Sequence, residues 1–266
     1  MRKIGVAITH GIGEQDANFA EPLIKELRER FGEAVFEKSE GRVKNAEEML
    51  YFKSIWWGPL SSARQAEFYS RAMATGLPND GKMRNFFALF AGDLIAYYQS
   101  KDTGKQADRR SWGLYQQVQQ LFFEKVVELS EEVEEDGQIT MIAHSLGTIM
   151  ALDWLKYHSE TLLGRVQNLF LLGSPKAVAN MGYADYGHPG FRLPGRFINF
   201  IGPDDMVAWP LAHLNSSWAE ARVEDKAITV GGPLTSWNAA SHTEYWTDND
   251  FTKPAAEILA EQFLVG

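Results

Sequence analysis

The 266-residue chain contains no cysteine, which excludes disulfides and thiolate metal sites. Its 35 acidic residues outnumber 26 basic ones, and the net charge of −9 argues against nucleic acid as a partner and against charge-driven binding to anionic membranes. No apolar run approaches membrane-spanning length, and the first residues lack the apolar core and cleavage site of a signal peptide. We therefore expect a cytoplasmic protein without a transmembrane segment, although peripheral contact with lipid stays open.

Apolar residues make up 45% of the chain, as in an ordinary globular protein. We expect a single domain over residues 1–266, and nothing in the sequence specifies its oligomeric state, a metal or a cofactor. Strands alternate with helices, which predicts an α/β fold with a mostly parallel central sheet flanked by helices. The expected strands cover residues 3–9, 33–38, 49–57, 138–143, 167–173, 196–201 and 226–230, and the main helices cover 17–31, 146–158 and 253–264.

The most informative stretch is Ala143-His144-Ser145-Leu146-Gly147, which joins an apolar strand to an apolar helix. A small-x-Ser-x-small pattern at such a junction is typical of a nucleophile elbow, a sharp turn that lifts a serine hydroxyl above the sheet edge. Residues two before and two after the serine crowd together there, and Ala143 and Gly147 are small enough. The helix start directs backbone N–H groups toward an oxyanion. The alternative interpretation is that Ser145 only caps its helix.

A second motif, Thr9-His10-Gly11-Ile12-Gly13, directly follows the apolar strand at residues 4–8. Gly11 can adopt dihedrals that are closed to other residues, so a His-Gly turn here can supply the other backbone N–H donor of an acyl-transfer site. The alternative is an ordinary glycine-rich turn after a strand. The lysine of a phosphate-binding P-loop is absent, and the dinucleotide fingerprint is incomplete.

A candidate acid and a candidate base follow later in the chain. The expected strand that ends at Ile201 runs into Gly202-Pro203-Asp204-Asp205-Met206-Val207, and an aspartate just past a strand end can orient a histidine. Both Asp204 and Asp205 qualify, and turn capping accounts for one of them. Of the six histidines, His242 is the best-placed base, because enough chain separates it from the acid for another strand. It is expected in a polar loop before the last helix.

The order Ser, Asp, His is typical of α/β-hydrolases, and the chain resembles the lipase and esterase type of that superfamily. Leu172-Gly173-Ser174-Pro175 resembles the strand end that follows the nucleophile helix in many lipases. In this family the acid commonly reads Gly-x-x-Asp-x-Val, which favours Asp205. The motifs around His10 and Ser145 are also similar, over short segments, to DDHD-type intracellular phospholipases. Ala143 departs from the more usual glycine.

The resemblance implies a serine hydrolase that cleaves carboxylic esters, with a lipid or other acyl ester as its small-molecule substrate. The same residues fit an acyltransferase or a thioesterase, because such a triad does not choose the leaving group. A catalytically silent hydrolase fold that acts as a binding protein is the remaining alternative. The implied catalytic residues are Ser145, Asp205 and His242, the oxyanion donors are the N–H groups of Ile12 and Leu146, and the surrounding loops contain His10, Gly11, His144 and Gly147.

The connection from His10 to Ser145 is 135 residues long, where the resemblance implies only one strand and two helices, and its unusual part is residues 58–135. We predict a helical, cap-like insertion here, rich in aromatic residues. Phe86, Phe87 and Phe90 fall on one broad helical face. They either pack the insertion onto the body or line an acyl pocket beneath a lid.

Overall fold

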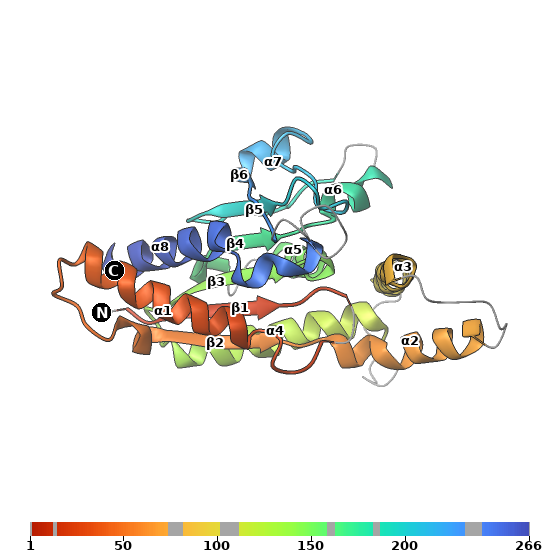
Figure 1. Ribbon diagram of the computed structural model, residues 1–266, viewed down its shortest axis with the longest axis horizontal. Coiled ribbons are helices and arrows are strands. Elements are labelled where there is room, and N and C mark those ends of the chain that lie inside the picture. The colour runs from red at the N-terminus through yellow and green to blue at the C-terminus, as the bar shows by residue number, and fades with distance from the viewer. Residues whose placement is uncertain are drawn as a thin grey trace.

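The central element of the fold is one parallel β-sheet. The computed structural model describes residues 2–12, 15–73, 82–101, 112–158, 163–182, 187–231 and 241–265. Within them, six strands pair in the order β2-β1-β3-β4-β5-β6, and every neighbouring pair is parallel (Figure 1). The strands are β1 (Ile4–Thr9), β2 (Leu50–Ile55), β3 (Gln138–His144), β4 (Val166–Leu172), β5 (Phe197–Ile201) and β6 (Val223–Ala227). The predicted α/β class is therefore confirmed.

Helices cover both faces of the sheet. On one face lie α1 (Glu21–Lys38) and α8 (Asn249–Val265), and on the other lie α4 (Leu114–Glu132) and α5 (Leu146–Tyr157) (Figure 1). Strand β1 is buried along its whole length because alternate side chains enter the two apolar clusters: Ile4, Val6 and Ile8 on the α1 side, Ala7 on the other. The remaining helical elements are α2 (Gly58–Met73), α3 (Lys82–Lys101), α6 (Lys176–Ala179), α7 (Ser216–Glu220), η1 (Ala46–Met49), η3 (Leu163–Arg165), η4 (Asn180–Gly182) and η5 (Ser241–Thr247).

Two sequence-based expectations about strands are wrong. Residues 33–38 form the last turns of α1, because Leu27, Phe31 and Val35 continue its buried stripe at a spacing of four. The last strand is Val223–Ala227 rather than 226–230. It is an edge strand with charged residues, a composition that discourages pairing with other chains and hides the strand from a hydrophobicity search.

The described part of the connection between β2 and β3 consists mainly of the helices α2, α3 and α4. Helix α2 starts near the carboxyl end of β2 and extends beyond that edge of the sheet, and α4 returns along the sheet (Figure 1). Phe90 of α3 is 9% exposed and belongs to the core cluster that also contains Trp57, Leu146 and Ile149. The side chains of Phe86 and Phe87 lie outside the described residues.

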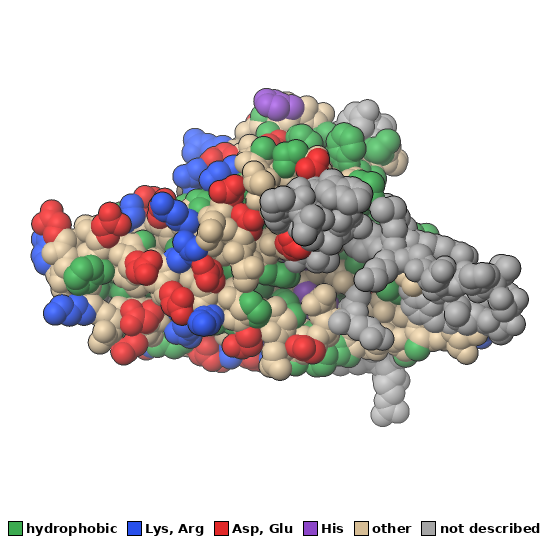
Figure 2. All heavy atoms as spheres, in the orientation of Figure 1, with side chains coloured by type: hydrophobic (Ala, Val, Ile, Leu, Met, Phe, Trp, Pro, Cys, Tyr) green, Lys and Arg blue, Asp and Glu red, His purple; other side chains and the backbone are tan. Residues whose placement is uncertain are grey.

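The surface over α1 and α8 has a mixed charge. Acidic and basic side chains alternate there (Figure 2), with pairs such as Arg30–Glu26 at 2.6 Å and Lys38–Glu261 at 3.0 Å. This face therefore has no continuous basic patch of the kind that binds nucleic acid. None of the described helices combines the length and the apolar character that crossing a membrane requires.

Candidate active site

Ser145 lies at the carboxyl edge of the sheet, between β3 and α5. Its backbone has a φ of 53° and a ψ of −128°, a combination that non-glycine residues rarely adopt. The Ser145 N–H donates to the carbonyl of Leu172 at 2.9 Å, and the Ser145 carbonyl accepts from Thr148 N at 2.9 Å and Thr148 Oγ1 at 2.6 Å. Neighbours on both sides therefore hold this strained turn in place.

Two glycines allow the β1 loop to approach this turn closely. A Cβ atom on Gly147 would lie 2.4 Å from the carbonyl oxygen of His10, and one on Gly11 would lie 2.4 Å from Ser145 Cβ. Neither position can therefore hold a side chain without moving the backbone. Ala143, the other small residue of the motif, is fully buried.

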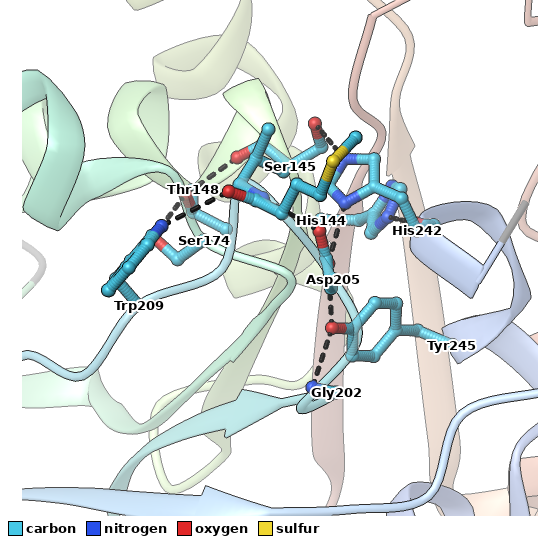
Figure 3. A network of polar contacts seen from close by, with 11 residues as sticks. His144, Ser145, Thr148, Ser174, Gly202, Asp205, Trp209, His242 and Tyr245 are labelled. Carbon is cyan, nitrogen blue, oxygen red and sulfur yellow. Dashed lines mark hydrogen bonds and ion pairs between the residues drawn. The ribbon is translucent and has the colours of Figure 1, made fainter. Parts of the chain in front are cut away.

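Ser145, His242 and Asp205 form a continuous hydrogen-bonded array (Figure 3). His242 Nε2 lies 2.7 Å from Ser145 Oγ, and His242 Nδ1 lies 2.7 Å from Asp205 Oδ2. Ser145 is fully buried, and the other two residues are at most 6% exposed. The geometry fits a neutral imidazole that donates from Nδ1 and accepts from the serine hydroxyl at Nε2.

Asp205, rather than Asp204, is the carboxylate that contacts His242 in this array. Asp204 is exposed, whereas Asp205 is buried and its second oxygen accepts from Val207 N at 3.0 Å. Burial alone would raise the pKa of Asp205, but the hydrogen bonds from His242, Val207 and Tyr245 lower the pKa below its ordinary value. The carboxylate is therefore ionised at neutral pH.

Tyr245 completes the array and escaped the sequence analysis. Its hydroxyl donates to Asp205 Oδ2 at 2.8 Å and accepts from Gly202 N at 2.9 Å (Figure 3). Burial and the charge of Asp205 raise the pKa of Tyr245 far above its ordinary value, so the hydroxyl keeps its proton. His242 lies in the short 3₁₀-helix η5 rather than in the expected loop, and residues three apart share one face of such a helix. That spacing was the available signal.

His144 and His10 are buried neutral side chains beside the array. His144 Nε2 donates to the backbone carbonyl of His242 at 2.6 Å, and burial, with the neighbouring His242, lowers the pKa of His144 to about 3. The ring of His10 stacks on Trp57 at 4.9 Å, and burial lowers the pKa of His10 to about 4. His10 Nε2 accepts from the N–H groups of Trp57 and Gly58 at 3.1 and 3.2 Å. Both histidines thus hold backbone in place.

The two expected oxyanion donors are next in sequence to residues of this turn and its neighbouring loop. Leu146 is the first residue of α5, and its N–H belongs to the first turn, whose donors have no intrahelical acceptor. Ile12 is 9% exposed and follows Gly11, the residue in contact with Ser145.

A second buried serine, Ser174, lies behind the turn. Its Oγ is 2.8 Å from Thr148 Oγ1 and accepts from Lys176 N at 3.3 Å. Within the described ranges, no group of three or more His, Asp or Glu side chains is placed to hold a metal ion.

Comparisons with known proteins give a weak likeness to a solved structure and no match to a known family. A scan against models of known protein families finds no match, and a search of curated proteins finds none. Among solved structures, the chain is similar to phospholipase PlaB from Legionella pneumophila in complex with thio-NAD, with 14% sequence identity and a TM-score of 0.31. The likeness covers 86% of this chain and 38% of PlaB, so this chain spans well under half of that protein.

Proposed function

We propose that the chain is a serine hydrolase that cleaves carboxylic esters through an acyl-enzyme. The observation that carries this proposal is the line from Ser145 Oγ through His242 to Asp205, with two contacts of 2.7 Å, on a strained turn between strand and helix. A serine that only capped its helix would need neither the buried histidine nor the ionised carboxylate behind it.

In the proposed reaction, His242 Nε2 takes the proton of Ser145 while Oγ bonds to the ester carbonyl carbon. The negative charge that develops on the carbonyl oxygen is held by the N–H groups of Ile12 and Leu146. The C–O bond to the alcohol then breaks, and His242 gives its proton to the leaving alcohol. Water, activated by the same histidine, hydrolyses the acyl-serine and restores the hydroxyl.

Asp205 holds His242 in the required tautomer and stabilises the imidazolium that forms at each step. Tyr245 and Val207 N–H hold the carboxylate in turn, and His144 fixes the backbone of the base. Tyr245, Val207 and His144 act as positioning residues, because they contact the array and not the reacting carbonyl. An acyl ester of a lipid or a smaller alcohol is the expected substrate class, with Phe86, Phe87 and Phe90 as the candidate wall for the acyl chain.

The test is labelling with a fluorophosphonate probe, together with hydrolysis of p-nitrophenyl acetate. Ser145→Ala should abolish labelling and reduce turnover by about 10⁴-fold or more. Ser174→Ala is the matched control, because it removes another buried serine hydroxyl from the same edge of the sheet and should leave labelling intact. A Ser145→Ala enzyme that keeps most of its activity would exclude the proposed nucleophile.

The same assay separates the alternatives that share this array. An acyltransferase would form a new ester when an alcohol acceptor is added, whereas a hydrolase would release mainly the free acid. A thioesterase would favour thioesters over oxygen esters of the same acyl chain. If the folded wild-type chain neither reacts with the probe nor turns over any of these substrates, the chain is a binding protein and the proposal fails.

A further inference from the structure

A second buried polar cluster lies further along helix α5. A cavity of about 310 Å³ is lined there by Asp153 and Lys156 of α5, by Lys176 and Asn180 from the segment after β4, and by His188. Leu152, the first α5 residue of the lining, is seven positions after Ser145, or about 10 Å along the helix at roughly 1.5 Å per residue. The cavity is therefore separate from the reacting serine.

Lys176 is a buried cation with little local compensation. Lys176 is only 9% exposed, and its ammonium donates to Tyr98 Oη in a long hydrogen bond of 3.5 Å. No carboxylate of the described part of the chain forms an ion pair with it. Lysine is rarely buried without such a partner, because removing its charge from water is costly.

Asp153, the carboxylate that lines the cavity, already has a cation. Lys101 Nζ lies 3.1 Å from Asp153 Oδ2. The same ammonium lies over the rings of Tyr98, Tyr115 and Tyr157, 5.1 to 5.8 Å from their centres. Aromatic faces attract a cation, so this arrangement fixes Lys101 against Asp153.

Among the described residues that line it, the cavity thus has an excess of positive charge. Lys101 balances Asp153, and Lys156 and Lys176 remain. Burial lowers the pKa of Lys176, and the nearby Lys101 and Lys156 lower it further, although Asp153 opposes them. An anion in the cavity would stabilise the charged form of Lys176 and remove the repulsion between the lysines.

We propose that this cavity binds a phosphate group, with Lys176 as its main ligand and Lys156 as the second cation. A phosphate monoester has a charge close to −2 at neutral pH, which matches two uncompensated ammonium groups. The volume also leaves room for a small organic group beside the phosphate. This inference does not depend on the proposed hydrolase activity.

The cavity and Ser145 are joined through polar contacts. Lys176 N donates to Ser174 Oγ, which contacts Thr148 Oγ1, and that hydroxyl donates to the Ser145 carbonyl (Figure 3 shows the last two contacts). The bound phosphate can therefore come from two kinds of molecule. One is a small phosphoester that binds separately, and the other is a substrate whose acyl ester reaches Ser145.

The experiment is calorimetric titration of the full chain with inorganic phosphate and with glycerol 3-phosphate at low salt. Lys176→Met should weaken binding at least about tenfold, whereas Lys176→Arg should retain most of it. Lys25→Met, an exposed lysine of α1, makes the same charge change at a distance and should leave binding unchanged. The melting temperature should not fall in Lys176→Met, because methionine replaces a buried cation with an apolar side chain of similar length.

Two results would overturn the proposal: no phosphate binding by the wild-type chain up to about 10 mM, or equal weakening by Lys25→Met and Lys176→Met. Kinetics then identify the source of the phosphate. If Lys176→Met raises KM for a lysophosphatidate ester but not for p-nitrophenyl acetate, the phosphate belongs to the substrate. If phosphate binding is lost and both KM values are unchanged, it belongs to a separate ligand. Because titration needs no turnover, failure of the hydrolase proposal would not imitate either outcome.

Discussion

The sheet edge around Ser145 and the helical insertion between β2 and β3 are held in place by different forces. At the edge, single hydrogen bonds of 2.6 to 2.8 Å fix Asp205, His242 and the backbone that supports them. In the insertion, Phe90 is held by apolar contacts that have no preferred direction. Replacing a single polar atom at the edge should therefore alter the catalytic rate. In the insertion, removing side-chain volume should instead lower the stability of the fold.

The largest effect on turnover is expected from a substitution of Asp205, which tests the directional bonding at the sheet edge. Asp205→Asn keeps the shape of the side chain but favours the wrong tautomer of His242, so turnover should fall by about 10³- to 10⁴-fold with little loss of folding. Asp204→Asn, the adjacent exposed carboxylate, is the control and should retain most activity. Steady-state kinetics on p-nitrophenyl acetate measure both. The opposite ranking would assign the acid to Asp204.

Phe90→Ala tests the insertion. If Phe90 is core, its removal should cost about 3–5 kcal/mol of stability and affect all substrates together. Phe36→Ala on α1, where the ring is 51% exposed, should stay within about 1 kcal/mol. Melting temperature is measured beside activity on acetate and octanoate esters. A selective loss of octanoate activity with unchanged stability would instead make Phe90 a wall of the acyl pocket.

Acid should weaken the edge before it weakens the insertion. The folded-state pKa values of His10 and His144 lie below the value of about 6.5 that each has in the unfolded chain. At pH values between the two, the unfolded chain therefore binds more protons than the folded chain. Stability is therefore fully present above pH 6.5 and should fall by about 2 kcal/mol per histidine by pH 5. Denaturant unfolding at pH 7 and pH 5 measures this. The His144→Gln variant should be less stable than the wild type at pH 7, and its stability should fall less between pH 7 and pH 5. If its stability fell as much as that of the wild type, His144 would not be a neutral side chain in the folded state.

The smallest effect distinguishes two buried tyrosines. Tyr245→Phe removes a donor to Asp205, and kcat should fall about tenfold with KM nearly unchanged. Tyr97→Phe removes a buried hydroxyl that bonds to Gln119 in the insertion, and it should reduce stability without changing kcat. Equal effects of the two substitutions on kcat would show that Tyr245 has no positioning role.

The sequence predicted the edge better than the insertion for a physical reason. A sharp turn and a strand end demand particular residues at fixed spacing, so Ser145, Gly147 and Gly11 are recognisable from a few letters. The parallel sheet is likewise visible as buried apolar runs such as β1. Strand β6 is hidden because its residues are charged, and the expected strand at 33–38 is wrong because Val35 continues the buried stripe of α1.

Contacts between distant segments were not accessible from the sequence. The bond from Tyr245 to Asp205 and the stacking of Trp57 on His10 join elements far apart in the chain. The ion pair of Lys101 with Asp153 and the contact of the buried Lys176 with Tyr98 depend on where α3 lies relative to α5 and α6, which no local pattern encodes. For the same reason the sequence could not decide whether Phe90 is core or pocket wall.

The backbone of Ser145 has a consequence for how this chain can change over generations. A φ of 53° is easy for glycine and costs a serine on the order of 1–3 kcal/mol. Selection for a durable fold alone would therefore favour glycine at position 145, and the change would cost the proposed nucleophile. Replacing Ser145 by glycine would stabilise the fold but remove the hydroxyl. Only continued selection for a function of that hydroxyl would therefore keep serine at this position.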